Sequence, residues 1–157
     1  MEPNIGLSTK TRKDVAHLLN LLLADEYLLY TKTLNYHWNV YGMVFHDFHK
    51  LFKEQYEALL DLADEIAERV RSLGHDSFGS MAEFSKHTRL KEQPGKVPDA
   101  LSMIKNLLAD HETIVRQMRA DIDKCQELGD TGTNNFLTDL MERHEKFAWM
   151  LRATATK

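Results

Sequence analysis

Four side chains of the kinds that bind transition metals stand at regular spacings in the first half of the chain. Two are imidazoles, His37 and His49, and two are carboxylates, Asp64 and Glu68. Neutral imidazole nitrogen suits iron, zinc and copper, and carboxylate oxygen complements it where iron is oxidised. Asp64 and Glu68 are four residues apart, which places them on one face of a helix. The four groups together predict a transition-metal site.

The spacing of the four groups decides whether one chain can supply them all. Gly42 lies between His37 and His49, and a helix that stops there lets the two imidazoles meet. Asp64 follows His49 by fifteen residues on the same predicted helix, which is about 22 Å at the helical rise. Metal–ligand bonds are only about 2 Å long. If one ion takes all four ligands, Asp64 and Glu68 must come from a second chain, and a two-fold axis would then create two equal sites.

A di-iron centre inside a single bundle is the competing design. It needs a Glu-x-x-His pair on each of two helices. The residues three before the histidines of the later helices and the crossover are not glutamates: Ser72 precedes His75, Leu108 precedes His111 and Met141 precedes His144. The acids Glu26, Glu112 and Glu145 remain without a matching histidine spacing. The sequence therefore argues against this centre, and no function is assigned to His17, His75, His87, His111 or His144.

Four long stretches of helical apolar periodicity would position these groups. They run over about residues 10–41, 47–73, 99–128 and 134–152. Thr9 or Thr11 is expected to cap the first helix. Residues 74–98 contain three of the seven glycines and two of the three prolines, which interrupt helices, with MAEFSKH as a short helix between them. The pattern predicts an all-α, ferritin-like four-helix bundle with a short helix in the long crossover between the second and third long helices. We expect one domain over residues 1–157, with residues 1–9 as a flexible tail.

Composition narrows the possible partners. The formal net charge is −4 over 157 residues, which gives no electrostatic reason for nucleic acid or an anionic membrane as the main partner. Cys125 is the only cysteine, so an intrachain disulfide and a cysteine-rich zinc site are excluded. No stretch approaches the roughly 18 apolar residues of a membrane span, and the first residues do not resemble a signal peptide. A cytoplasmic location is expected.

The segments HWNVYGMVFHDFHKLF, DEIAER, DHETIVRQMR and LGDTGTNNFLTDL resemble the Dps mini-ferritins, the DNA-protection-during-starvation proteins, over about residues 10–152. The resemblance implies a hollow dodecameric shell with ferroxidase centres at its two-fold interfaces. It also implies that His37, His49, Asp64 and Glu68 bind iron(II), with zinc possible in the same site. Hydrogen peroxide, in preference to dioxygen, would oxidise the iron, and ferric mineral would be stored inside the shell as a protection against oxidative stress.

The resemblance extends to residues around the site. Trp38, next to His37, is a candidate to take up a stray oxidising equivalent. Family members admit iron through acid-lined pores at three-fold axes, and Asp130 and Asp139 lie in the corresponding segment. Asp130 is equally well interpreted as a turn residue in GDTG.

Two features depart from the family pattern. Lys50 and Lys53 stand where acids often promote mineral nucleation, leaving Glu54, Glu57 and Asp61 as candidates. Basic residues near the start are few and the end reads ATATK, so we expect weak or no DNA binding, because lysine-rich tails supply phosphate contacts. A DNA-compacting, nucleoid-associated structural protein is the alternative interpretation. A helical assembly without catalysis, or one whose site prefers zinc, is the third.

Overall fold

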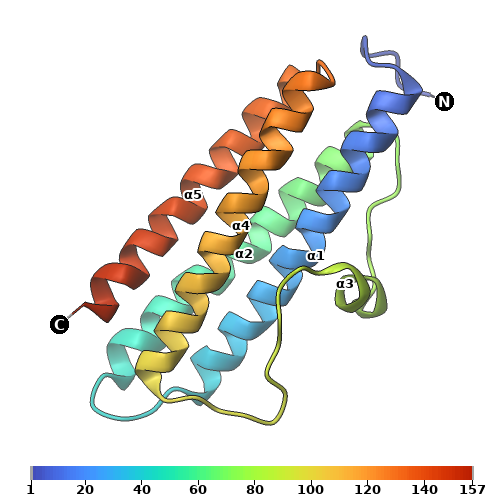
Figure 1. The fold of residues 1–157 in the computed structure, drawn as a ribbon. Coiled ribbons are helices and arrows are strands. Elements are labelled where there is room, and N and C mark those ends of the chain that lie inside the picture. The colour runs from blue at the N-terminus through green and yellow to red at the C-terminus, as the bar shows by residue number, and fades with distance from the viewer. Residues whose placement is uncertain (1, 157) are drawn as a thin grey trace.

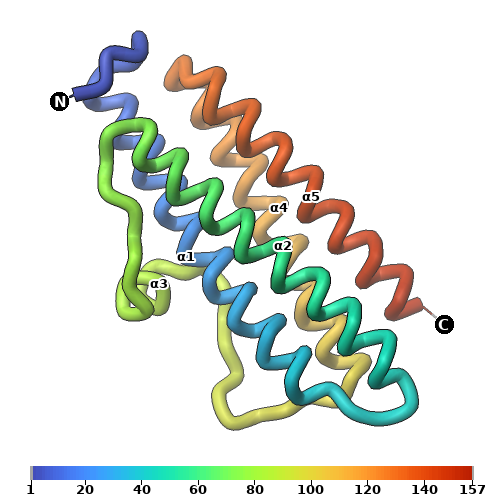
Figure 2. Tube along the Cα trace, turned by 180° about the vertical axis from the view of Figure 1, so that it is seen from behind, coloured from blue at the N-terminus to red at the C-terminus, as the bar shows by residue number. Residues whose placement is uncertain are grey.

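The computed structural model describes residues 2–156, and Met1 and Lys157, the two ends of the predicted domain, lie outside the described residues. Within the described part the chain forms helices only. These are α1 (Thr9–Asn39), α2 (Phe45–Ser72), α3 (Met81–His87), α4 (Ala100–Glu127) and α5 (Thr131–Ala155). Helices α1 and α2 form one antiparallel hairpin and α4 and α5 form another, and the short α3 lies outside the bundle against α1 (Figures 1 and 2). The predicted all-α, ferritin-like bundle with a short crossover helix is confirmed.

The core lies between the two hairpins and is built from the apolar stripes of the four long helices. Its largest fully buried side chains are Leu19, Leu22, Leu23, Leu29, Phe52, Leu59, Leu62, Ile66, Leu73, Met103, Ile104 and Leu107. Each such side chain contributes roughly 1.5–3 kcal/mol by its removal from water. Among residues 2–156, no helix is both long enough and apolar enough to cross a bilayer.

The start of α1 differs from the prediction. Ser8 is the N-cap, and its hydroxyl accepts a hydrogen bond from the Thr11 backbone N–H at 3.0 Å. Thr9 and Thr11 are already helical, so neither is the cap. A serine oxygen satisfies one of the free amides of the first turn, which fixes the helix start at Thr9, inside the segment expected to be flexible.

The turn between α1 and α2 has the predicted length of five residues but lies two residues earlier in the chain. Helix α1 ends at Asn39 and α2 begins at Phe45, each two residues before its expected boundary. Val40 is extended, and Gly42 has φ of +101°, a conformation that only glycine adopts at little cost. The Phe45 N–H then donates to the Gly42 carbonyl at 3.1 Å, so the chain reverses within five residues and starts α2 early.

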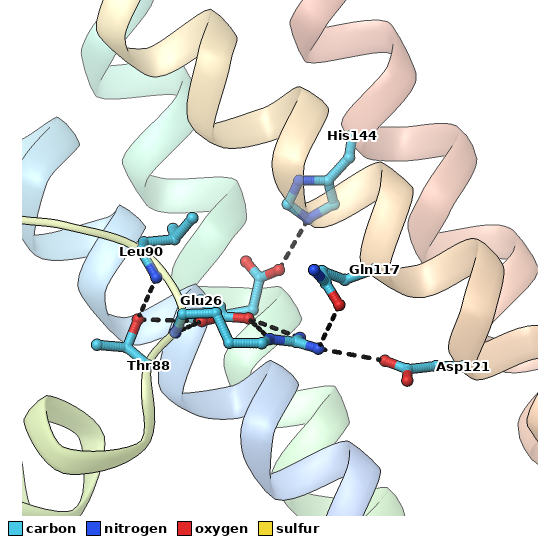
Figure 3. A network of polar contacts seen from close by, with 8 residues as sticks. Glu26, Thr88, Leu90, Gln117, Asp121 and His144 are labelled. Atoms are coloured by element: carbon cyan, nitrogen blue, oxygen red, sulfur yellow. Dashed lines mark hydrogen bonds and ion pairs between the residues drawn. The ribbon is translucent and has the colours of Figure 1, made fainter.

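The crossover is fastened to the bundle by a buried polar network (Figure 3). The carboxylate of Asp25 in α1 accepts hydrogen bonds from the Arg89 backbone N–H at 2.6 Å, from its Nε at 2.7 Å and from the Thr88 hydroxyl at 3.0 Å. Arg89 also donates to Gln117 of α4 at 3.2 Å and lies 3.7 Å from Asp121. One arginine thus ties the segment after α3 to both hairpins.

Candidate metal site

His37 and His49 lie side by side at one end of the bundle. His37 belongs to the last turn of α1, His49 belongs to the second turn of α2, and the turn at Gly42 brings the two together. Their rings stack with centroids 3.8 Å apart and planes 21° apart. His37 is 8% exposed, while His49 is half-buried. The two imidazoles therefore form a compact pair at the edge of the subunit.

Each histidine is oriented by the backbone of the other. His37 Nδ1 lies 2.7 Å from the His49 carbonyl oxygen, and His49 Nδ1 lies 2.8 Å from the His37 carbonyl oxygen. A carbonyl oxygen only accepts, so each Nδ1 must carry the hydrogen and donate it. In the neutral rings both Nε2 atoms then hold a free lone pair. This is how ligating histidines are held, because a bond from the second nitrogen fixes tautomer and direction.

Aromatic side chains enclose the pair. Tyr56 meets the His37 ring edge to face at 5.2 Å, and Phe45 stacks on His49 at 4.9 Å. Several apolar residues of the adjoining turn are exposed: Trp38, Tyr41, Met43, Val44 and Phe45. Such a concentration of exposed apolar surface marks a protein–protein contact more often than a free surface.

Asp64 and Glu68 lie further along α2, both exposed. Neither carboxylate has a hydrogen-bond or ion-pair partner within residues 2–156. The arginines that stand close to them in sequence are used elsewhere: Arg69 binds Asp130 and Thr133, and Arg71 binds Asp76 and the His75 carbonyl. The two acids are therefore available to an ion or to another chain.

The four predicted ligands do not all meet in one subunit. Across residues 2–156, no group of three or more His, Cys, Asp or Glu side chains is placed to hold one metal ion. The structure brings His37 and His49 together, and it leaves Asp64 and Glu68 on the outer surface of α2. A metal ion coordinated by all four side chains would need the two acids from a neighbouring chain.

The other predicted residues take different positions. Trp38 is 67% exposed. Asp139 is exposed on α5 and pairs with Arg143 at 2.6 Å.

Asp130 is buried and caps α5, since its carboxylate accepts from the Thr133 N–H at 2.9 Å and from the Thr133 hydroxyl at 2.6 Å. Arg69 also donates to it at 3.2 Å. Because of this cap, α5 begins at Thr131, earlier than the predicted 134–152, and it continues to Ala155. These contacts give Asp130 a structural role, and a pore role for Asp130 or Asp139 stays a prediction.

Sequence reasoning missed a second histidine cluster, in the middle of the bundle, and Figure 3 shows its contact between His144 and Glu26. His144 Nε2 of α5 lies 2.9 Å from a Glu26 carboxylate oxygen of α1, and His144 Nδ1 lies 2.9 Å from His111 Nδ1 of α4. Both histidines are completely buried. Burial, with a smaller contribution from His144, holds the pKa of His111 well below its usual range. The sequence did contain a signal for the burial of His111, because His111 follows Leu107 by four residues and precedes Ile114 by three. This spacing places it on the same buried face of α4.

Comparison with known proteins agrees with the fold. Residues 16–157 match the family model of the ferritin-like domain. An uncharacterized low temperature-induced protein of Nostoc sp. PCC 7120 is 50% identical over 151 residues, 96% of this chain and 84% of that protein. A DNA protection during starvation protein of Helicobacter pylori is 32% identical over 136 residues, 87% of this chain and 94% of the relative. The DPS protein of Vibrio cholerae O1, a member of the ferritin-like diiron-carboxylate superfamily, superposes with a TM-score of 0.93 at 32% identity, covering 99% and 97% of the two chains. The chain therefore belongs to the Dps mini-ferritin family of ferritin-like proteins.

Proposed function

We propose that this protein is a ferroxidase that oxidises iron(II), stores the ferric product inside a hollow homo-oligomeric shell and so protects the cell from oxidative stress. Membership of the Dps and ferritin-like diiron-carboxylate group supports iron storage and protection in general terms. The observation that carries the proposal is the histidine pair, whose Nδ1 atoms are taken by backbone carbonyls and whose Nε2 atoms are left for a metal.

The proposed iron site joins two subunits. His37 and His49 of one chain supply neutral nitrogen, which suits iron(II), and Asp64 and Glu68 of a two-fold related chain supply hard oxygen, which stabilises iron(III) as charge grows. A two-fold contact makes this site twice. The absence of hydrogen-bond and ion-pair partners for both acids within residues 2–156 and the exposed apolar turn beside the histidines support such a contact. Zinc would compete for the same ligands.

Hydrogen peroxide is the oxidant that we propose, ahead of dioxygen. Peroxide accepts two electrons and two protons to form two water molecules, so two iron(II) ions consume it without releasing hydroxyl radical. Trp38 would take up an oxidising equivalent that escapes this pairing. A Trp38→Phe variant with an unchanged radical yield would remove Trp38 from the proposal.

Other features of the proposal concern the shell. We propose a dodecamer in which iron enters through acid-lined pores, with the exposed Asp139 a better candidate for the lining than the buried Asp130. Glu54, Glu57 and Asp61 would promote mineral growth. Lys50 lies 3.9 Å from Glu54 and Lys53 lies 3.6 Å from Glu57, which weakens the local negative charge.

The net charge of −4 argues for weak or no DNA binding, and we place the protein in the cytoplasm rather than on the nucleoid.

Iron oxidation followed by absorbance tests the function. The wild type should oxidise iron(II) rapidly with peroxide and slowly with air, and His49→Ala should lose most of the peroxide-driven rate. His46→Ala is the matched control, because His46 is exposed and precedes His49 by one helical turn. Equal rates for the wild type and His49→Ala would contradict the proposal. Particle mass and iron content of the same sample report on assembly and loading.

A further inference from the structure

A row of tyrosines leads from the histidine pair along the contact between α1 and α2. Tyr56 of α2 meets His37 edge to face at 5.2 Å, and Tyr30 of α1 meets Tyr56 at 6.1 Å. Tyr27 meets Tyr30, again at 6.1 Å, and stacks on Phe84 of α3 at 4.1 Å. The three edge-to-face contacts have interplanar angles of 67°, 73° and 70°. The aromatic contacts are therefore unbroken from His37 to α3.

The environment of the row suits redox chemistry. Tyr27, Tyr30 and Tyr56 are each half-buried, so the rings are held in place by packing while the phenol edges stay near solvent that can exchange protons. None of the three hydroxyls has a hydrogen-bond partner within residues 2–156, whereas the buried Tyr36 hydroxyl accepts a hydrogen bond from Asn106 at 3.0 Å. A phenol must release its proton when it is oxidised, and contact with water allows this.

The far end of the row reaches the acid side of the proposed site. Tyr27 and Asp64 line the same hollow of about 380 Å³ between α1, α2 and the segment 78–84. In the proposed two-fold arrangement, His37 of a subunit belongs to one iron site and Asp64 of the same subunit belongs to the other. In that arrangement the row of tyrosines connects the two iron sites of a pair within one chain.

We propose that Tyr56, Tyr30 and Tyr27 relay electrons between the two iron sites of a subunit pair. The relay rests on the proposed function, because its reactants are iron(II) and hydrogen peroxide. At the histidine end, iron(II) gives peroxide one electron and Tyr56 gives the second together with its phenolic proton. With one more proton from solvent, the O–O bond breaks, two waters form, and iron(III) and the Tyr56 phenoxyl radical remain.

The radical is then removed stepwise. Tyr30 gives an electron and a proton to Tyr56, and Tyr27 gives the same to Tyr30. Iron(II) at the Asp64 end reduces Tyr27 while solvent supplies the proton. The sum is one peroxide, two iron(II) ions and two protons converted to two iron(III) ions and two waters. The relay therefore lets two separate sites act as one two-electron donor.

Freeze-quenched electron paramagnetic resonance of the assembled protein tests the relay. The wild type, loaded anaerobically with iron(II) and mixed with peroxide, should show a tyrosyl radical that persists at low iron loading and decays quickly at full loading. Tyr56→Phe should lose the signal. Tyr30→Phe should keep it, but the lifetime should no longer depend on iron loading because the second site is disconnected. Tyr36→Phe is the matched control and should behave as the wild type.

Iron(III) absorbance in the same samples separates two kinds of failure. If the wild type forms no iron(III) with peroxide, the proposed function is wrong and the relay falls with it. If iron(III) forms and Tyr56→Phe retains the full tyrosyl signal, the relay alone is overturned. A signal that is lost in Trp38→Phe and kept in Tyr56→Phe would also overturn it, because the radical would then start on the exposed indole.

Discussion

The chain contains two histidine pairs that join helices, and they are built in opposite ways. His37 and His49 lie at the end of the bundle and donate from Nδ1 to each other's backbone carbonyls, so both Nε2 atoms stay free. His111 and His144 lie in the core, where their Nδ1 atoms face each other at 2.9 Å and His144 also contacts Glu26. The two pairs differ in which ring nitrogen has no partner and in whether a metal ion can reach it. This difference makes the outer pair suited to binding and the buried pair suited to holding helices together.

The buried pair links the two hairpins. Glu26 belongs to the first hairpin and both histidines belong to the second, so the contact at 2.9 Å between Glu26 and His144 crosses the core. A carboxylate without a partner at such a place would be costly, since the desolvation of a buried charge is repaid only by close polar contacts. We therefore expect the buried pair to govern stability and the outer pair to govern iron chemistry.

The largest effect is expected from His144→Leu. Leucine fills similar space but leaves Glu26 buried without a polar partner, which should lower the free energy of unfolding by about 3 kcal/mol. Urea unfolding at one fixed protein concentration measures the loss. His49→Leu is the control, and it should cost less because His49 is half-buried at the bundle end. The comparison fails if the two variants unfold at the same urea concentration.

The complementary change is His37→Ala. It removes one Nε2 ligand, the ring that stacks on His49 and the Nδ1 hydrogen bond to the His49 carbonyl, so peroxide-driven iron oxidation should fall by at least about tenfold, in line with the effect of disturbed ligand shells. The rate of iron(III) formation measures it. His111→Gln should retain the wild-type rate wherever it remains folded. A His37→Ala protein with undiminished oxidation would show that the outer pair is not the iron site.

The sequence predicted the outer histidine pair but not its hydrogen bonds or the buried pair, for physical reasons. Helical periodicity and Gly42 were sufficient to place His37 beside His49, because a short turn leaves few ways for two helices to pair. The reciprocal backbone hydrogen bonds depend on where each helix ends, and both ends lay two residues from the predicted positions. The meeting of Glu26, His111 and His144 was missed because spacing within one helix does not say which faces of separate helices meet.

A smaller effect of the buried pair should be a fall in the free energy of unfolding at acid pH. Burial lowers the pKa of His111 in the folded state, whereas in the unfolded chain the pKa of a histidine is about 6.5. The unfolded state therefore binds more protons below that pH, and stability falls as pH falls from about 6.5 towards the folded pKa. The slope is at most about 1.4 kcal/mol per pH unit for one proton. Urea midpoints between neutral and mildly acid pH should show this slope in the wild type and a weaker one in His111→Gln; identical slopes would refute the assignment to His111.

The smallest expected effect concerns how firmly the outer pair is held. Phe45 stacks on His49 at 4.9 Å, and an aromatic contact of this kind is worth about 0.5–1.5 kcal/mol. Phe45→Leu keeps both histidines and their backbone hydrogen bonds but frees the His49 ring, so iron(II) affinity measured anaerobically by calorimetry should weaken by roughly two- to tenfold, following from that energy. Phe48→Leu is the matched control, because Phe48 packs against Phe52 at 6.0 Å rather than against a histidine. Equal affinities for the two variants would mean that the backbone carbonyls alone orient His49, and the outer pair would then owe its geometry entirely to the turn at Gly42.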